Sequence, residues 1–139
     1  MFFHSKQKQH FKYKKRLNYK CIVSKNGNYG FKALTSGKLI LSKTNFLEKI
    51  LARKLKSISR GATPIRFWSL IFTHITLTRL PQESRMGKGK GNVYTKFCYI
   101  KQGQILFEFS NVSLYQISQI FNYMKNKFPL KIKLSKILT

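Results

Sequence analysis

Apolar residues recur at helical spacing between residues 42 and 60. They stand three and four positions apart, and basic residues fill the positions between them, so one helix face can pack while the others stay charged. Ser42 is the expected N-cap, and Gly61 is expected to end the helix. The apolar positions are Leu47, Ile50, Leu51, Leu55 and Ile58. The basic positions are Lys49, Arg53, Lys54, Lys56 and Arg60.

A second helix is predicted to begin at Ser113. Gln116 follows three residues later, which is the spacing of a capping box, and Pro129 is expected to stop the helix. Its buried stripe is predicted to consist of Leu114, Ile117, Ile120, Phe121, Met124 and Phe128.

Short apolar alternations predict the strands of a sheet. Residues 19–35 favour two strands around a glycine-rich turn, and residues 65–80 form a β-rich run whose apolar members are expected in the core. Residues 93–100 and 105–109 predict a hairpin across the turn at residues 101–104. Residues 130–134 can add a last strand. With two helices, these strands predict a single α+β domain over residues 21–139.

A glycine-lysine loop separates the β-rich run from the predicted hairpin, and residues 85–91 read RMGKGKG. Glycines at alternate positions remove side-chain bulk, so the backbone can approach another surface closely. Lys88 and Lys90 offer ammonium groups to phosphates, and Arg85 can bind a phosphate in two places or stack on a base. The loop therefore predicts tight contact with a polyanion. A flexible loop without a partner is the alternative.

Two other phosphate-binding motifs do not fit this loop. A P-loop would need glycine where Gln82 stands and a serine or threonine where Gly89 stands. A dinucleotide fingerprint would need glycine in place of Asn92.

The charge balance indicates the kind of partner. The 139 residues include 28 Lys and Arg against three Glu and no Asp, which gives a formal charge of +25. Such a chain repels itself unless a polyanion neutralises it, so we expect a complex with nucleic acid. A membrane surface is disfavoured because no run approaches the roughly 18 consecutive apolar residues of a spanning helix. The basic face of the first helix, Arg53, Lys54, Lys56 and Arg60, is therefore expected to contact RNA.

Residues 1–20 are predicted to form a basic RNA-binding arm. Six lysines and Arg16 are interleaved with aromatic residues that can stack on bases, and such arms often become ordered only on RNA. The cationic candidates in it are Lys12, Lys14, Lys15 and Arg16. The start of the chain shows neither a signal peptide nor a transit peptide, so an organellar protein is expected to have been made inside the organelle.

No catalytic or metal-binding constellation is visible. Three isolated glutamates offer no carboxylate pair, and no aspartate exists to orient a histidine. Cys21 and Cys98 are far apart and are expected to be reduced and buried or half-buried. We predict no enzyme activity, no cofactor, no metal and no small-molecule substrate.

Four segments, taken in order, resemble the large-subunit ribosomal protein sixteen family, which has the archaeal and eukaryotic L-ten-e proteins as relatives. One of the four is RMGKGKG with the Asn-Val-Tyr that follows it. Residues 29–34 are similar to the family's FGLKA segment, residues 102–108 to its PG-x-ILFE hairpin, and residues 127–133 to its KLPIKTKF ending. Four matches in the same order are more specific than any one of them.

The resemblance implies an α+β fold: a two-layer sandwich of two helices on a mostly antiparallel, hammerhead-like sheet, with a basic N-terminal arm. It also implies a structural constituent of the large ribosomal subunit that binds rRNA near the A site and the peptidyl transferase region. There it contacts neighbouring ribosomal proteins and helps to position tRNA. The family's functional loop falls on Arg85, Met86, Gly87, Lys88, Gly89 and Lys90. Where the family carries an arginine and a proline, this chain has Leu70 and Thr73.

The residue bias, these departures and the chain start favour a protein encoded in a mitochondrial genome, with a plastid or the bacterial cytoplasm as alternatives. A free-standing basic nucleic-acid-binding protein, not stably part of a ribosome, is the alternative function. Firm association with large subunits in high salt separates the two.

Overall fold

Seven strands and two helices make up the part of the chain that the computed structural model describes, namely residue 8 and residues 26–59, 64–87 and 89–136. The helices are α1 (Leu41–Ile58) and α2 (Leu114–Met124). The strands are β1 (Tyr29–Ala33), β2 (Gly37–Ile40), β3 (Arg66–Ser69), β4 (Ile75–Arg79), β5 (Asn92–Ile100), β6 (Ile105–Ser110) and β7 (Ile132–Lys136). The predicted α+β class is confirmed.

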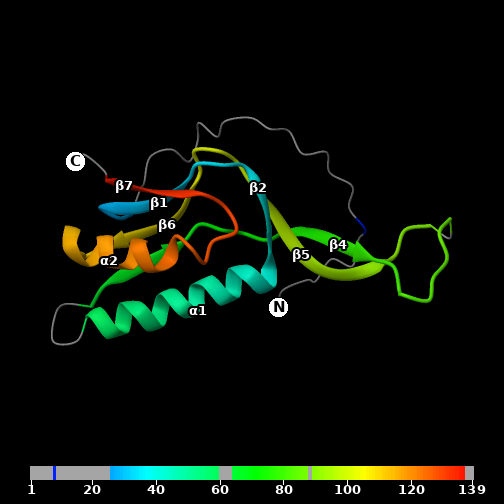
Figure 1. Cartoon of the computed structure of the whole chain (residues 1–139), viewed down its shortest axis with the longest axis horizontal. Coiled ribbons are helices and arrows are strands. Elements are labelled where there is room, and N and C mark those ends of the chain that lie inside the picture. Colours follow the sequence, from blue (N-terminus) through cyan, green and yellow to red (C-terminus); the bar gives the residue numbers. More distant parts are fainter. Residues whose placement is uncertain (1–7, 9–25, 60–63, 88, 137–139) are drawn as a thin grey trace.

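The strands form two antiparallel sheets. One has four strands in the order β3-β6-β1-β7, and the other has three in the order β2-β5-β4. Both helices pack against the four-stranded sheet and share one hydrophobic core with it. The sheet is one layer of a sandwich, and the two helices are the other. In Figure 1, β4 and β5 extend away from this body and carry the loop at residues 80–91 at their far end. The second sheet therefore holds the loop clear of the core.

The predicted hairpin between β5 and β6 is wrong, although both strands and the turn exist. β5 pairs with β2 and β4, whereas β6 pairs with β1 and β3. The turn carries the chain from one sheet to the other, and its ends bond to β1: Gly103 N–H donates to Ala33 O, and Ala33 N–H donates to Gln104 O, both at 2.8 Å. β6 is an interior strand of its sheet: β1 and β3 pair with its two edges, and residues 105–109 are all buried.

The β-rich run is divided in the same way. β3 belongs to the four-stranded sheet and β4 to the three-stranded one, and residues 70–74 cross between them. Ile71 and Ile75 are buried as expected, but the side chains of Leu70 and Phe72 are 40% and 76% exposed. The expectation that the apolar members belong to the core is therefore wrong for these two residues, which lie on the crossing segment. The Phe72 ring stacks on His74.

The other strands agree in part with the sequence. β1 is the second of the two strands predicted in residues 19–35, and the first lies outside the described residues. β2 was not predicted because Gly37–Ile40 is short and leads directly into a helix. The last strand is confirmed and runs two residues further than expected, to Lys136.

Helix α1 begins one residue before Ser42, so Ser42 is not its cap. The N-cap is Ile40, which has no side-chain capping bond and still pairs with Phe97 in the three-stranded sheet. The helix starts where this strand pairing ends, and that tertiary constraint overrides the capping preference. Leu47, Leu51 and Leu55 are buried as predicted.

Helix α2 has the predicted capping box. Gln116 N–H donates to Ser113 Oγ at 3.3 Å, and Ser113 N–H donates to Gln116 Oε1 at 3.0 Å. The helix ends at Met124, well before Pro129, because Lys127 N–H turns back to Met124 O at 2.9 Å. Phe128 is buried from the following turn, whereas Leu114 is 62% exposed and does not belong to the buried stripe.

Phenylalanine rings join the four-stranded sheet to α2. The Phe31 ring centroid lies 4.8 Å from that of Phe109 and 5.7 Å from that of Phe121. Phe107 contacts Phe128 edge-on at 6.0 Å. Phe31, Phe107 and Phe109 are completely buried, so a short run of β1 and β6 supplies the centre of the core.

Replacing Ser113 with alanine should lower the free energy of unfolding by about 1 kcal/mol, because the substitution leaves the Gln116 N–H without its acceptor. Urea denaturation of the full chain, followed by circular dichroism, measures the change. Ser118→Ala is the matched control, since Ser118 is exposed within α2. Equal effects from the two substitutions would contradict a capping role.

Burial raises the pKa of the Cys98 thiol to about 11 from 9.0. In a Cys21→Ser background, Cys98 should therefore react with iodoacetamide at pH 8 roughly 100-fold more slowly in the folded chain than in the unfolded chain. The folded state keeps a proton that the unfolded chain releases, so stability should fall as pH rises from 9.0 to about 11. Rapid alkylation of the folded protein would contradict this.

Candidate nucleic-acid interface

The loop at residues 80–91 is held at its base by the end of the β4–β5 ladder. Arg79 pairs with Asn92 as the last pair before the loop, and Thr78 pairs with Val93. Ser84 N–H donates to Pro81 O at 3.1 Å, which makes a turn on the outgoing side. We name the residues at this base, 79–82 and 92–94, the loop neck.

A β-bulge shapes the loop neck. Leu77 pairs with Thr95 and Thr78 with Val93, so Tyr94 has no partner across the ladder. In a regular ladder Tyr94 would pair with Thr78 and lie on the opposite face from Arg79. With the bulge, the guanidinium carbon of Arg79 lies 5.7 Å from the Tyr94 ring centroid. One unpaired residue thus brings a cation and an aromatic ring together.

The loop glycines serve two different purposes. Gly87 and Gly89 have φ angles of 90° and 84°, and a Cβ on either would meet nothing within 4 Å. They allow left-handed backbone at an open tip, where a partner can approach. A Cβ on Gly91 would lie 2.4 Å from the carbonyl oxygen of Arg79, so Gly91 is needed for the two sides of the neck to meet.

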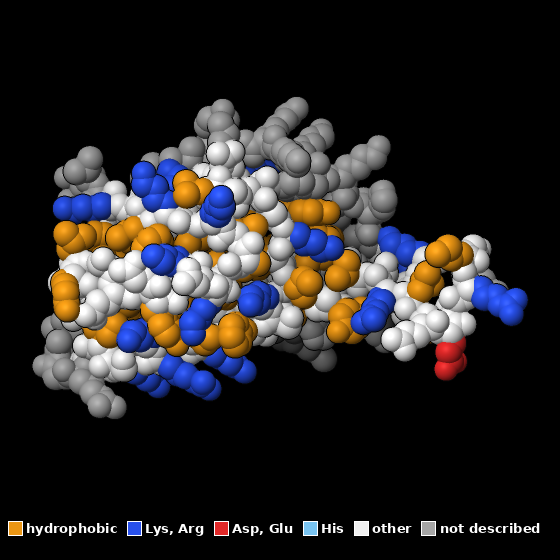
Figure 2. Space-filling model, in the orientation of Figure 1, with side chains coloured by type: hydrophobic (Ala, Val, Ile, Leu, Met, Phe, Trp, Pro, Cys, Tyr) orange, Lys and Arg blue, Asp and Glu red, His pale blue; other side chains and the backbone are white. Residues whose placement is uncertain are grey.

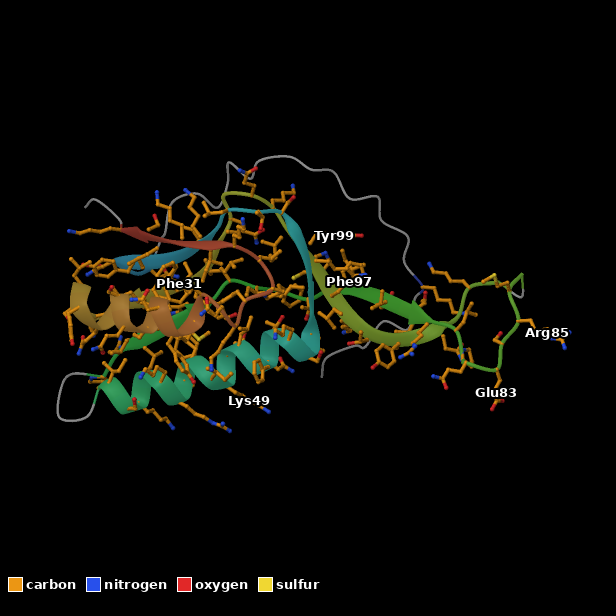
Figure 3. All side chains as sticks on the ribbon, in the orientation of Figure 1. Phe31, Lys49, Glu83, Arg85, Phe97 and Tyr99 are labelled. Atoms are coloured by element: carbon orange, nitrogen blue, oxygen red, sulfur yellow. The ribbon has the colours of Figure 1, made fainter. Side chains whose placement is uncertain are left out.

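Side chains at the loop tip face solvent. Met86 is 98% exposed, and Arg85 and Lys90 are exposed as well. Figure 3 shows Arg85 pointing away from the body, with Glu83 on another side of the loop. The predicted loop residues are therefore placed together at one accessible tip, apart from Lys88, which lies outside the described residues.

One described residue of the N-terminal arm reaches this loop. Lys8 Nζ donates to the carbonyl oxygen of Lys90 at 2.9 Å. The contact joins two regions that the sequence separates by 82 positions. The arm candidates Lys12, Lys14, Lys15 and Arg16 lie outside the described residues.

A second cationic surface lies on α1. Lys49, Arg53 and Lys56 are exposed at positions that share one helix face, and Figure 2 shows cationic side chains along this helix and around the loop. Lys54 lies on another side of α1, with its ammonium group 5.3 Å from the Tyr123 ring centroid of α2. Arg60 lies outside the described residues.

Sequence reasoning missed the part of α2 that joins this second surface. Lys127 Nζ lies 3.9 Å from the Tyr123 ring centroid, on the same ring that Lys54 approaches. A hydrogen bond with Lys127, together with the charges of Lys127, Lys54 and Arg53, lowers the pKa of the Tyr123 hydroxyl. Cations from α1 and from the turn after α2 therefore gather around one exposed ring of α2, which only the packing of α1 on α2 could reveal.

The two cationic surfaces lie far apart. Figure 1 places the loop at one end of the long axis and the C-terminal half of α1 toward the other. Few carboxylates can compensate them, because the chain has three glutamates and Glu108 is 1% exposed. Its Oε2 accepts the N–H of Asn26 at 2.8 Å. The arrangement suits a long polyanion that follows the molecule better than one small anion.

Other kinds of site find no support among the described residues. No group of three or more His, Cys, Asp or Glu side chains is placed to hold a metal ion there. In the same part of the chain, no helix has the length and apolar character needed to cross a membrane.

A basic α+β domain with a projecting glycine-lysine loop fits the ribosomal proteins as a class, and comparison with known sequences supports that class. The chain matches the family described as "Ribosomal protein L16p/L10e" over residues 3–135. The chain therefore belongs to this family, which confirms the resemblance found in the sequence. Ribosomal proteins are a structural class, not an enzymatic one.

Individual relatives agree with this assignment. The chain is 39% identical over 108 residues to "Large ribosomal subunit protein uL16m" of Chondrus crispus, covering 78% of each chain. It is 34% identical over 110 residues to the protein of the same name from Marchantia polymorpha, covering 79% of this chain and 77% of the relative. "Large ribosomal subunit protein uL16" of Sulfurihydrogenibium sp. is also 34% identical over 110 residues, covering 79% of this chain and 75% of the relative.

Replacing Gly91 with alanine should open the loop neck, because the new Cβ would overlap the Arg79 carbonyl. We expect the backbone amides of Thr78 and Arg79 to exchange hydrogen at least about tenfold faster. Gly89→Ala is the control, since the added Cβ would meet nothing within 4 Å. The strain of that substitution comes from the φ angle of residue 89 alone and stays within the loop. Unchanged exchange in Gly91→Ala would contradict a role of this glycine in closing the neck.

Proposed function

We propose that this ribosomal protein is a structural constituent of the large ribosomal subunit, where it binds rRNA near the A site and helps to position aminoacyl-tRNA. The observation that carries the proposal is the RMGKGKG loop. It stands clear of the core on the β4–β5 ribbon, with Arg85 and Lys90 exposed at its tip.

The loop tip has the features that close contact with RNA requires. Its glycines leave the backbone N–H groups accessible, and phosphate oxygens accept hydrogen bonds from such groups. Arg85 offers a planar fork for a phosphate or a flat surface for a base, and Met86 offers an apolar contact. Lys8 adds a cation from the arm at the Lys90 carbonyl. Together these groups can hold RNA at the level of the loop.

The surface on α1 and α2 supports a structural role. Lys49, Arg53 and Lys56 face solvent on one side of α1, and Lys54 and Lys127 gather at Tyr123. Because this surface lies far from the loop, one chain can neutralise phosphates in two separate parts of a folded RNA. Contacts of this kind would stabilise the arrangement of RNA helices without any reaction.

We further propose that the particle is the mitochondrial ribosome. The relatives in Chondrus crispus and Marchantia polymorpha carry the name uL16m, which is of the mitochondrial type. The chain also has 22 Lys against 6 Arg and many Phe and Ile residues, as AT-rich codons produce. A plastid or bacterial particle is the alternative, since a bacterial uL16 reaches the same 34% identity as the protein of Marchantia polymorpha.

Replacing Lys88 and Lys90 together with alanine should weaken both rRNA binding and A-site tRNA binding. Loss of two phosphate contacts should reduce the slope of log affinity against log salt by roughly 1.4 to 1.8, and tRNA affinity should fall about tenfold. Filter binding across a salt series and tRNA binding to purified ribosomes measure the two effects.

The double variant Lys101→Ala/Lys125→Ala removes two exposed lysines outside both surfaces and is the control. Normal tRNA affinity in the Lys88→Ala/Lys90→Ala particles would contradict the assignment of the loop. Release of the unsubstituted chain from large subunits in high-salt sucrose gradients would contradict membership of the particle and favour a free-standing nucleic-acid binder.

A further inference from the structure

The loop neck borders a shallow surface cavity that contains no residue of the loop tip. Its volume is about 380 Å³, and most of it is open to solvent. Strand β4 and the residues after it supply one wall, and the start of β5 supplies the other. The lining residues are Arg79, Leu80, Pro81, Gln82, Asn92, Val93 and Tyr94.

The lining combines the groups that recognise an unstacked nucleobase. Tyr94 is 66% exposed and offers a flat aromatic surface. The Arg79 guanidinium carbon lies over the same ring, 5.7 Å from its centroid, and a guanidinium plane can also stack on a base. Gln82 and Asn92 carry side-chain amides that both donate and accept hydrogen bonds, as base edges require. No lining residue carries a negative charge, so nothing in the lining repels a phosphate.

The size and position of the cavity fit the same ligand. Small-molecule sites begin at about 300 Å³, so this cavity can hold a base with part of its ribose. The cavity sits directly at the base of the RMGKGKG loop, between the residues that enter and leave it. An RNA strand held at the loop tip would therefore pass close to the cavity.

We propose that the loop neck binds a single unpaired nucleotide of RNA, with the base stacked against Tyr94 and Arg79. The proposal rests on the proposed rRNA-binding function and adds a site to it. In this arrangement the tip contributes phosphate contacts, which do not depend on sequence. The neck contributes contacts to one base, which fix the position of the strand along the loop.

The test compares large subunits that carry the unsubstituted full chain, Tyr94→Phe or Tyr94→Leu. Phenylalanine keeps the aromatic surface, whereas leucine keeps apolar volume without a ring. Dimethyl sulfate and carbodiimide report which unpaired bases are accessible. We expect one nucleotide to be protected in the unsubstituted and Tyr94→Phe particles, and to become roughly tenfold more reactive in Tyr94→Leu, because a stacking partner is lost.

The outcomes separate this proposal from the proposed function. Stoichiometric chain in the Tyr94→Leu particles with no change at any base would overturn the neck site and leave the ribosomal role intact. Altered crosslinks to a neighbouring protein, with unchanged bases, would assign the cavity to a protein segment and also overturn it. Absence of even the unsubstituted chain from large subunits would overturn the ribosomal role itself.

A second measurement covers a Tyr94→Leu chain that fails to enter the particle. The unsubstituted full chain is irradiated with single-stranded RNA that contains 5-iodouracil, and the crosslinked residue is identified by mass spectrometry. A crosslink at Tyr94 supports the site, since this photochemistry joins the base to a stacked aromatic ring. Crosslinks confined to other residues would overturn it.

Discussion

Like charges repel one another throughout this fold, and little within the chain compensates that repulsion. The chain carries 28 cationic side chains against three carboxylates, and the Glu108 carboxylate is buried against the Asn26 amide. Cation–π contacts stabilise some of these cations, because lysine or arginine groups lie over the rings of Phe46, Tyr94, Phe97 and Tyr123. Such contacts contribute only about 0.5–1 kcal/mol each at exposed sites, so they offset a small part of the cost of the repulsion and neutralise no charge. The remaining charge favours binding to an external polyanion.

The architecture separates the groups that hold the fold from the groups that carry this charge. The centre of the four-stranded sheet is apolar on the side of the helices, with Phe31, Phe107 and Phe109 completely buried. Charge is placed instead on the solvent face of α1, around Tyr123, and on a ribbon that leaves the body. Binding a polyanion at these places adds to stability without disturbing the core, because ligands that bind only the folded state stabilise it. If RNA binds at these places as proposed, folding and binding are coupled through charge and not through shared packing.

Local patterns predicted the elements well and their partners poorly. The capping box at Ser113 and the leucines of α1 are local features, and both are confirmed. Ser42 has the right chemistry for a cap, but the pairing of Ile40 with Phe97 sets the helix start. The turn at residues 101–104 has the composition of a hairpin, yet it joins strands of different sheets, because strand choice depends on distant residues of β1 and β2. Alternation predicts a strand, but the strands that pair with it come from distant parts of the chain and leave no local pattern.

The same limit explains how much of the candidate site could be read from the sequence. RMGKGKG identifies the loop, because its lysines and arginine make it cationic and its glycines allow backbone conformations that other residues rarely adopt. The loop neck could not be identified, because Arg79 and Tyr94 stand on either side of the loop. The pattern of apolar and polar residues in their strands does not show where the bulge lies. A shift of one residue exchanges the faces of a strand, so a regular ladder would leave Arg79 and Tyr94 on opposite sides. The bulge leaves Tyr94 unpaired and places its ring near Arg79, where both line the cavity. The position of the bulge is set by how β4 pairs with β5, so neither strand's sequence alone reveals it.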